Sequence, residues 1–127
     1  IVVYNSSFES RILSQTVNSC GISKSWLNNI IKRFFDLSIP FENYYYYHPN
    51  QNGKVSLKTI LPILTGHSYS NLNIGEALDA ANEYMRVVFT QVSERDKIQT
   101  FNNLIEYGKL DTLGLIKILY KLKGMID

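Results

Sequence analysis

Several classes of protein are excluded by what this chain of 127 residues lacks. A single cysteine, Cys20, rules out an internal disulfide bond and a zinc site made of cysteines. The longest apolar runs fall far short of the roughly 18 to 20 residues that a membrane-spanning helix needs, so we expect no contact with a membrane. A positively charged leader with a cleavage site is also missing. We therefore expect a cytoplasmic protein.

Composition indicates an ordinary globular domain. The 13 basic and 11 acidic side chains give a net charge of +2, which is too small for a protein that wraps nucleic acid by charge alone. With 45% apolar and 19% charged residues, the chain can form a core and is not of the disordered class. Residues 1–127 suit a single domain. Because the first residues are Ile-Val-Val-Tyr without an initiator methionine, we expect a partial domain cut from a longer protein.

The first third of the chain predicts two short strands separated by two helices. Residues 2–4 are β-branched and aromatic, which is typical of a buried strand. Apolar residues at helical spacing predict helices over residues 8–20 and 26–34, the second capped by either Ser23 or Ser25. A second strand is predicted at residues 35–37, just before a proline.

The remainder is predicted to be mainly helical. The aromatic run at residues 44–47 favours extended structure, and Ser56 opens a helix in which Pro62 predicts a break. Residues 74–92 predict the longest helix, and Ser93 begins another that continues to residue 122. Because the first strand is apolar on both faces, as central parallel strands are, we expect a helix-rich α/β fold whose sheet is incomplete in this chain.

A candidate site follows the first strand. Asn5 and Glu9 stand at the start of a helix, at the carboxyl edge of a strand, where α/β proteins usually place their functional residues. The alternative is purely structural, with Asn5 capping the helix and Glu9 complementing its dipole.

A second candidate site lies near the other end of the chain. Tyr107 and Asp111 are four residues apart, so they share one face of a helix. A carboxylate can hold Mg²⁺ or Mn²⁺, and a neighbouring phenol can position water or a phosphate oxygen. The alternative is an amphipathic helix with a half-buried tyrosine and with Asp111 as a cap after Gly108.

In this order, the two sites resemble the second and third motifs of the DEDD superfamily of 3′→5′ exonucleases, in its tyrosine form. The resemblance implies a ribonuclease H-like fold, two Mg²⁺ or Mn²⁺ ions held by four carboxylates, and hydrolysis of nucleic-acid phosphodiester bonds. It implies that Glu9 and Asp111 are metal ligands and that Tyr107 orients the attacking water. Asn5 would hold the turn that presents Glu9, and Asp36, at a strand end, would lie near the site.

A wider resemblance covers most residues from 2 to 122. It is to a bacterial family of unknown function, DUF2779, whose members look like exonuclease-type domains at the C-terminal end of larger proteins. The matching segments, in order, are Val3-Tyr4-Asn5-x-x-Phe8-Glu9, Asp36-Leu37-x-x-Pro40-Phe41, Tyr47-His48-Pro49, Gly53-x-x-Ser56-Leu57-Lys58-x-Ile60-Leu61-Pro62 and Tyr107-Gly108-Lys109-Leu110-Asp111-Thr112.

The chain departs from the superfamily pattern at three points. Glu9 replaces the usual Asp, and Gly108 stands where the family commonly has Cys. The first motif, an Asp-x-Glu on the opening strand, does not precede Asn5. We therefore expect the C-terminal part of an exonuclease-like domain, truncated at its N-terminus and inactive by itself, with two metal carboxylates lying upstream of Ile1.

Two other functions remain open from the sequence. The first is a non-catalytic module of the same fold that binds nucleic acid or a partner protein. The second is a plain helical interaction domain, which predicts that Glu9 and Asp111 lie far apart. Residues 44–47 could also stack on single-stranded nucleic acid, with His48, Lys54 and Lys58 as nearby cations. A strand with tyrosine on both faces is the simpler interpretation, and Lys58 is then a solvent-exposed residue. An unpaired strand edge would favour a homo-oligomer.

Overall fold

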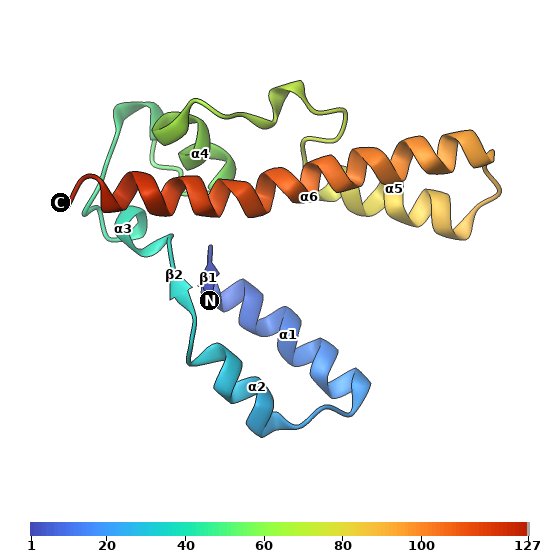
Figure 1. The fold of residues 1–127 in the computed structure, drawn as a ribbon, viewed down its shortest axis with the longest axis horizontal. Coiled ribbons are helices and arrows are strands. Elements are labelled where there is room, and N and C mark those ends of the chain that lie inside the picture. Colours follow the sequence, from blue (N-terminus) through green and yellow to red (C-terminus); the bar gives the residue numbers. More distant parts are fainter. Residues whose placement is uncertain (127) are drawn as a thin grey trace.

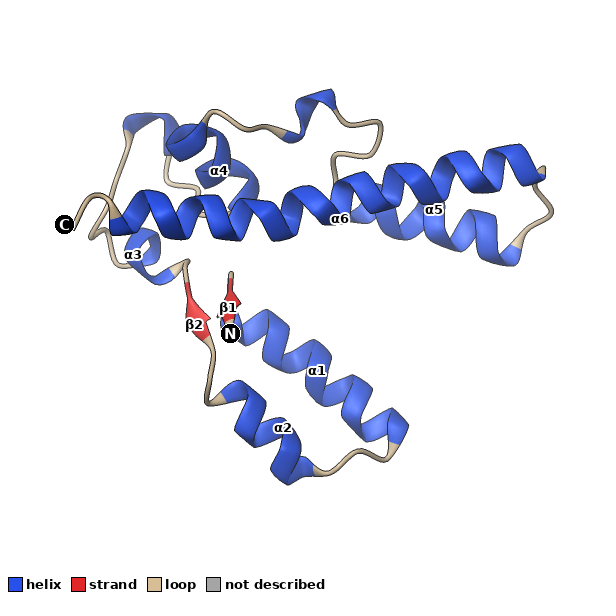
Figure 2. Ribbon diagram, viewed as in Figure 1, coloured by secondary structure: helices blue, strands red, loops and turns tan. Residues whose placement is uncertain are grey.

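The computed structural model describes residues 1–126 and has the helix-rich α/β character that the sequence predicts. Figure 2 shows how small the sheet is beside the helices. The elements are, in chain order, β1 (Val2–Val3), α1 (Ser6–Cys20), α2 (Lys24–Ile31), β2 (Phe35–Asp36), α3 (Ile39–Glu42), a 3-10 turn (Pro49–Gln51), α4 (Leu57–Thr65), a second 3-10 turn (Tyr69–Asn71), α5 (Ala77–Phe89) and α6 (Glu94–Lys123).

The two strands predicted from the sequence are present and pair in parallel. Val2 lies opposite Phe35 and Val3 opposite Asp36. The chain crosses from β1 to β2 through the α1–α2 hairpin, as a parallel pair requires a long connection. In the part of the chain that the structure describes, β2 is the sole partner of β1, so the other edge of β1 carries no strand.

Helix α6 runs along the length of the molecule and organises the rest (Figure 1). Helix α5 packs beside its N-terminal half as an antiparallel partner, and α4 packs against its C-terminal half. The α1–α2 hairpin projects from the sheet, away from α6. Within residues 1–126, no helix has both the length and the apolar character needed to cross a membrane.

The core lies where α3 and α4 meet α6. Phe41, Ile60, Leu61 and Ile118 are fully shielded from solvent there. A glycine on α6 permits the close approach, because a Cβ at Gly114 would lie 3.0 Å from Cδ2 of Leu61. The α4–α6 contact therefore fixes which stretch of α6 faces the strands and α1.

The prediction of extended structure at residues 44–47 is wrong. This segment forms a turn after α3, in which the backbone N–H of Tyr44 donates to Phe41 and that of Tyr46 donates to Pro40. Tyr44 adopts a left-handed conformation with φ of 55°. Only the ring of Tyr46 packs on buried Phe41, with 5.7 Å between ring centroids. Tyrosine favours extended structure where it packs beside a neighbouring strand, and this segment pairs with neither β1 nor β2.

Two helix predictions also need correction. The helix expected over residues 74–92 is shorter and starts only at Ala77, and α6 is the longest helix with 30 residues. Residue Ile74 is buried as part of the connector instead. The break predicted at Pro62 does not occur, since α4 continues to Thr65 and ends at left-handed Gly66. Three buried side chains of α4 hold it against the core, and tertiary packing outweighs the cost of one proline.

Candidate functional site

Glu9, Tyr107 and Asp111 line one open groove with a volume of about 430 Å³. Glu9 comes from the first turn of α1, and the other two come from the middle of α6. We call this feature the carboxylate groove; its walls are Tyr4, Phe8, Glu9, Ser56, Leu57, Lys58, Tyr107, Asp111, Thr112 and Leu115. The structure thus brings together the two sites singled out in the sequence, whereas a plain helical interaction domain predicted their separation.

The turn before α1 directs Glu9 into the groove. Asn5 is left-handed, with φ of 65°, and its side chain accepts the backbone N–H of Phe8 at 3.3 Å. Asn5 therefore caps α1, as the sequence predicts. The cap places Glu9 one turn into the helix, on the side that faces α6 across the groove. Asn5 itself lies in an adjoining hollow with Tyr4 and Phe8.

Asp36 lies outside the carboxylate groove and stabilises this turn through hydrogen bonds. Its carboxylate accepts the backbone N–H groups of Asn5 at 3.0 Å and Ser6 at 2.6 Å. It also accepts the backbone N–H of Ser38 at 2.9 Å and its hydroxyl at 2.8 Å. Burial alone would raise the pKa of Asp36, but the bonds from Ser6 and Ser38 outweigh it and lower this pKa to about 2. The ionised carboxylate of Asp36 thus links the end of β1 to the start of α3 through hydrogen bonds.

Asp111 is held by a residue that the sequence did not single out. The hydroxyl of Tyr69 donates to Oδ1 of Asp111 at 2.5 Å, and the Tyr69 ring is buried against Tyr107 with 5.8 Å between centroids. Burial raises the pKa of Tyr69, and the bond to Asp111 raises it further, so this phenol stays a donor. Because α6 is uninterrupted from residue 94 to 123, Asp111 is an interior helix residue and not a cap.

Lys58, which the sequence suggests as a cation beside residues 44–47 or as a solvent-exposed residue, lies in the carboxylate groove. Its ammonium donates to the carbonyl of Gly75 at 2.6 Å and to Glu76 Oε2 at 2.8 Å. It also lies over the rings of Tyr69 and Tyr107, 5.4 Å and 5.3 Å from their centroids. Burial acts to lower the pKa of Lys58, but the hydrogen bond and charge of Glu76 together with the contact to Tyr107 outweigh burial, and the pKa is raised. Lys58 therefore carries a fixed positive charge into the groove.

Tyr107 lies beside this cation and one turn from Asp111 on α6. Burial and the charge of Asp111 raise its pKa, although Lys58 acts in the opposite direction. A neutral phenol can donate a hydrogen bond and also accept one, so it can position a water molecule or a phosphate oxygen.

The carboxylate oxygens of the groove are ligands of the type that Mg²⁺ and Mn²⁺ prefer, but they are too few for a complete metal site. Both ions take carboxylate oxygens, which Glu9 and Asp111 supply. Oδ1 of Asp111 is engaged by Tyr69, which leaves Oδ2 for a ligand. Across residues 1–126, however, no three His, Cys, Asp or Glu side chains gather closely enough to hold a metal ion. A complete metal centre would need further carboxylates.

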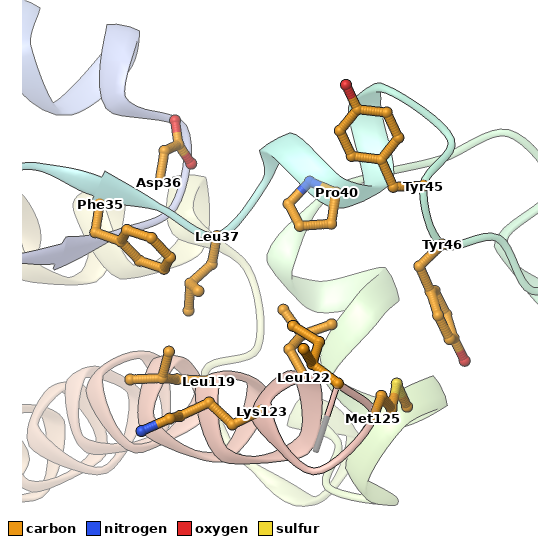
Figure 3. Close-up of a pocket in the computed structure, with 11 residues that line it drawn as sticks. Phe35, Asp36, Leu37, Pro40, Tyr45, Tyr46, Leu119, Leu122, Lys123 and Met125 are labelled. Carbon is orange, nitrogen blue, oxygen red and sulfur yellow. The ribbon is translucent and has the colours of Figure 1, made fainter.

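A second hollow, of about 400 Å³, lies between the β2–α3 segment and the end of α6 and shares no wall with the carboxylate groove. Figure 3 shows Leu37 and Leu119 pointing toward each other across it, while the carboxylate of Asp36 points away. Its lining is mainly apolar, with Phe35 half exposed at the rim. The hollow offers no pair of carboxylates and is not where the sequence motifs meet.

Comparison with known families covers the first part of the chain. Residues 1–56 match the family model described as a domain of unknown function, DUF2779, which supports the family that the sequence motifs indicate. The match includes Asn5, Glu9 and Asp36 and stops before Lys58 and Tyr107. No curated protein and no solved structure matches the chain.

Proposed function

We propose that the carboxylate groove is part of the active site of a metal-dependent 3′→5′ exonuclease-like domain of ribonuclease H-like fold, which hydrolyses nucleic-acid phosphodiester bonds in the full-length protein. One observation carries this proposal. Glu9 lines the same groove as Tyr107 and Asp111, although about a hundred residues separate it from them in the chain. Two isolated helix residues with purely structural roles would have no reason to meet there.

Glu9, Tyr107 and Asp111 each have a chemical role in this reaction. Glu9 and Asp111 would hold Mg²⁺ or Mn²⁺, and Tyr107 would orient the attacking water by a hydrogen bond. Tyr69 would keep Asp111 in one orientation, as the partners of metal ligands commonly do. A bound divalent ion lowers the pKa of water and stabilises the leaving oxygen.

The proposal depends on two more carboxylates. The superfamily supplies them from an Asp-x-Glu on a strand, and residues 1–127 contain no Asp-x-Glu. A strand carrying it could pair with the edge of β1 that has no partner among the described residues. If no such strand exists, a second copy of the chain could use the same edge, which would be seen as a mass that rises with concentration.

The test is degradation of labelled single strands by the full-length protein in the presence of Mg²⁺ or Mn²⁺. We expect the Asp111→Asn variant to lose activity by a factor of about a hundred or more, since metal-held charge stabilisation is worth several kcal/mol. Asp79→Asn is the matched control, because Asp79 is exposed on α5 and outside the groove. Undiminished hydrolysis by the Asp111→Asn variant would refute the assignment.

A second function fits one specific observation. Since two carboxylates line the groove among the described residues, and no third lies close enough to complete a metal site, the domain could bind nucleic acid or a partner protein without cleaving it. If the ligand is nucleic acid, the full-length protein retains single strands in the presence and absence of divalent ions and never shortens them; if it is a partner protein, single strands are neither retained nor shortened. The sequence preceding Ile1 also separates the two functions, because only the enzyme needs an Asp-x-Glu there.

A further inference from the structure

We propose that Lys58 is a phosphate-binding residue for the backbone of single-stranded nucleic acid, and that the carboxylate of Glu76 occupies its binding position in the free protein. This inference rests on the proposed function, because it takes the ligand of the carboxylate groove to be a nucleic acid. It adds a residue for substrate binding and a contact that competes with the substrate.

The position of Lys58 suits this role. Among the side chains that line the groove, Lys58 is the one with a positive charge, and it lies beside Tyr107. A phosphodiester entering the groove would be repelled by Glu9 and Asp111 in the absence of metal ions. A cation next to the tyrosine offsets this repulsion and gives the phosphate a defined place.

The ammonium of Lys58 is preorganised to receive an anion. The carbonyl of Gly75 anchors it at 2.6 Å, and the faces of the Tyr69 and Tyr107 rings lie beneath it. These contacts hold the charge in place without neutralising it. An ammonium has three N–H donors, so it can keep the bond to Gly75 while it exchanges its other partner.

Glu76 has the properties of a replaceable partner. Its side chain is 71% exposed, against 26% for Lys58. It occupies the N-cap position of α5 but makes no side-chain capping bond, so no hydrogen bond of α5 depends on where the carboxylate points. An ion pair this exposed contributes little to stability. A phosphodiester oxygen can therefore take its place at low cost.

The test is binding of a short fluorescein-labelled oligothymidylate, followed by fluorescence anisotropy in EDTA so that no hydrolysis can occur. We expect Lys58→Met to weaken binding about tenfold, the worth of one charge-assisted hydrogen bond. We expect Glu76→Gln to tighten binding up to about threefold, the worth of an exposed ion pair. Lys58→Arg keeps the charge and should stay close to the parent.

An ion pair within α6 supplies matched controls. Lys109 and Glu106 form an exposed pair at 2.6 Å outside the groove, so Lys109→Met and Glu106→Gln make the same charge changes elsewhere. Loss of one phosphate contact should also lower the slope of log affinity against log salt by about 0.7 in Lys58→Met alone. In the Lys58→Met background, Glu76→Gln should have no effect beyond that of Glu106→Gln.

Results of two kinds would overturn the inference. The first is equal binding by Lys58→Met and Lys109→Met, or a salt slope that Lys58→Met leaves unchanged. The second is failure of the parent chain to bind the oligonucleotide. Inorganic phosphate that competes for Lys58 as strongly as the oligonucleotide does would also overturn it. Failure of the nuclease assay is a separate outcome, because the binding measurement needs neither metal ions nor cleavage. If cleavage is absent but the variants bind as expected, Lys58 is still a phosphate-binding residue.

Discussion

Replacing Asp36 by Asn tests whether one carboxylate joins the sheet to the helix that presents Glu9. The four hydrogen bonds accepted by Asp36 come from two segments, the start of α1 and the turn before α3. An asparagine keeps the shape of the side chain but loses the charge, and one of its two terminal atoms becomes a donor. At least one N–H group would then face another N–H group.

The expected loss in the free energy of unfolding follows from the lowered pKa of Asp36. A drop from the ordinary 3.8 to about 2 corresponds to roughly 2 kcal/mol of differential stabilisation. Because the carboxylate is only partly buried, solvent screening reduces this to about 1 kcal/mol. The pKa is lower in the folded than in the unfolded chain, so the stabilisation is complete above the unfolded value near 4. It disappears as the pH falls from about 4 toward about 2.

The assay is urea unfolding of the parent and of Asp36→Asn, followed by circular dichroism from about pH 7 down to about pH 3. We expect the variant to be less stable by about 1 kcal/mol at neutral pH and the difference to shrink below about pH 4. Asp79→Asn, which changes an exposed carboxylate of α5, is the control. A deficit that stays constant through the acid range, or one no larger than that of the control, would refute the reasoning.

Two further predictions concern α6. Tyr69→Phe removes the bond to Asp111, and we expect a loss of about 1 to 2 kcal/mol in the free energy of unfolding, measured in urea; an unchanged value would mean that the bond contributes nothing. Gly108→Ala should stabilise the chain by up to about 1 kcal/mol, since nothing lies within 4 Å of the new Cβ. Gly114→Ala should instead destabilise it by about 1 kcal/mol, because the Cβ would press on Leu61; equal thermal shifts in the two variants would contradict this packing.

The elements that the sequence predicts correctly are those with local causes. Ser56 and Ser93 cap α4 and α6 by accepting the backbone N–H three residues on, which a sequence pattern can identify. Asn5 caps α1 in the same way. The error at residues 44–47 has the opposite origin. The propensity of tyrosine for strands is expressed only beside another strand, and the sequence does not show whether one is available.

The candidate site was predictable only in part, because its supporting residues come from segments far apart in the chain. Glu9, Tyr107 and Asp111 were found by motif, and the structure places them in one groove. Tyr69 was not found, and Lys58 was assigned to the surface of residues 44–47 and not to this groove. Tyr69 lies in a connector without periodicity, and Lys58 follows an apolar residue on a helix whose other face is buried. Their roles depend on contacts across the fold, which no spacing rule describes.

One residue of α6 did carry information about this arrangement. A glycine in a helix interior costs about 1 kcal/mol relative to alanine, and at Gly114, unlike Gly108, the close approach of Leu61 accounts for it. Gly114 lies about one turn from Asp111 and two turns from Tyr107, so all three share one stripe of α6. Across from it, Leu61 lies one turn from Lys58 on α4. The contact between Gly114 and Leu61 therefore sets the register in which Lys58 meets Tyr107, and a change in that contact should alter the groove before it alters the fold.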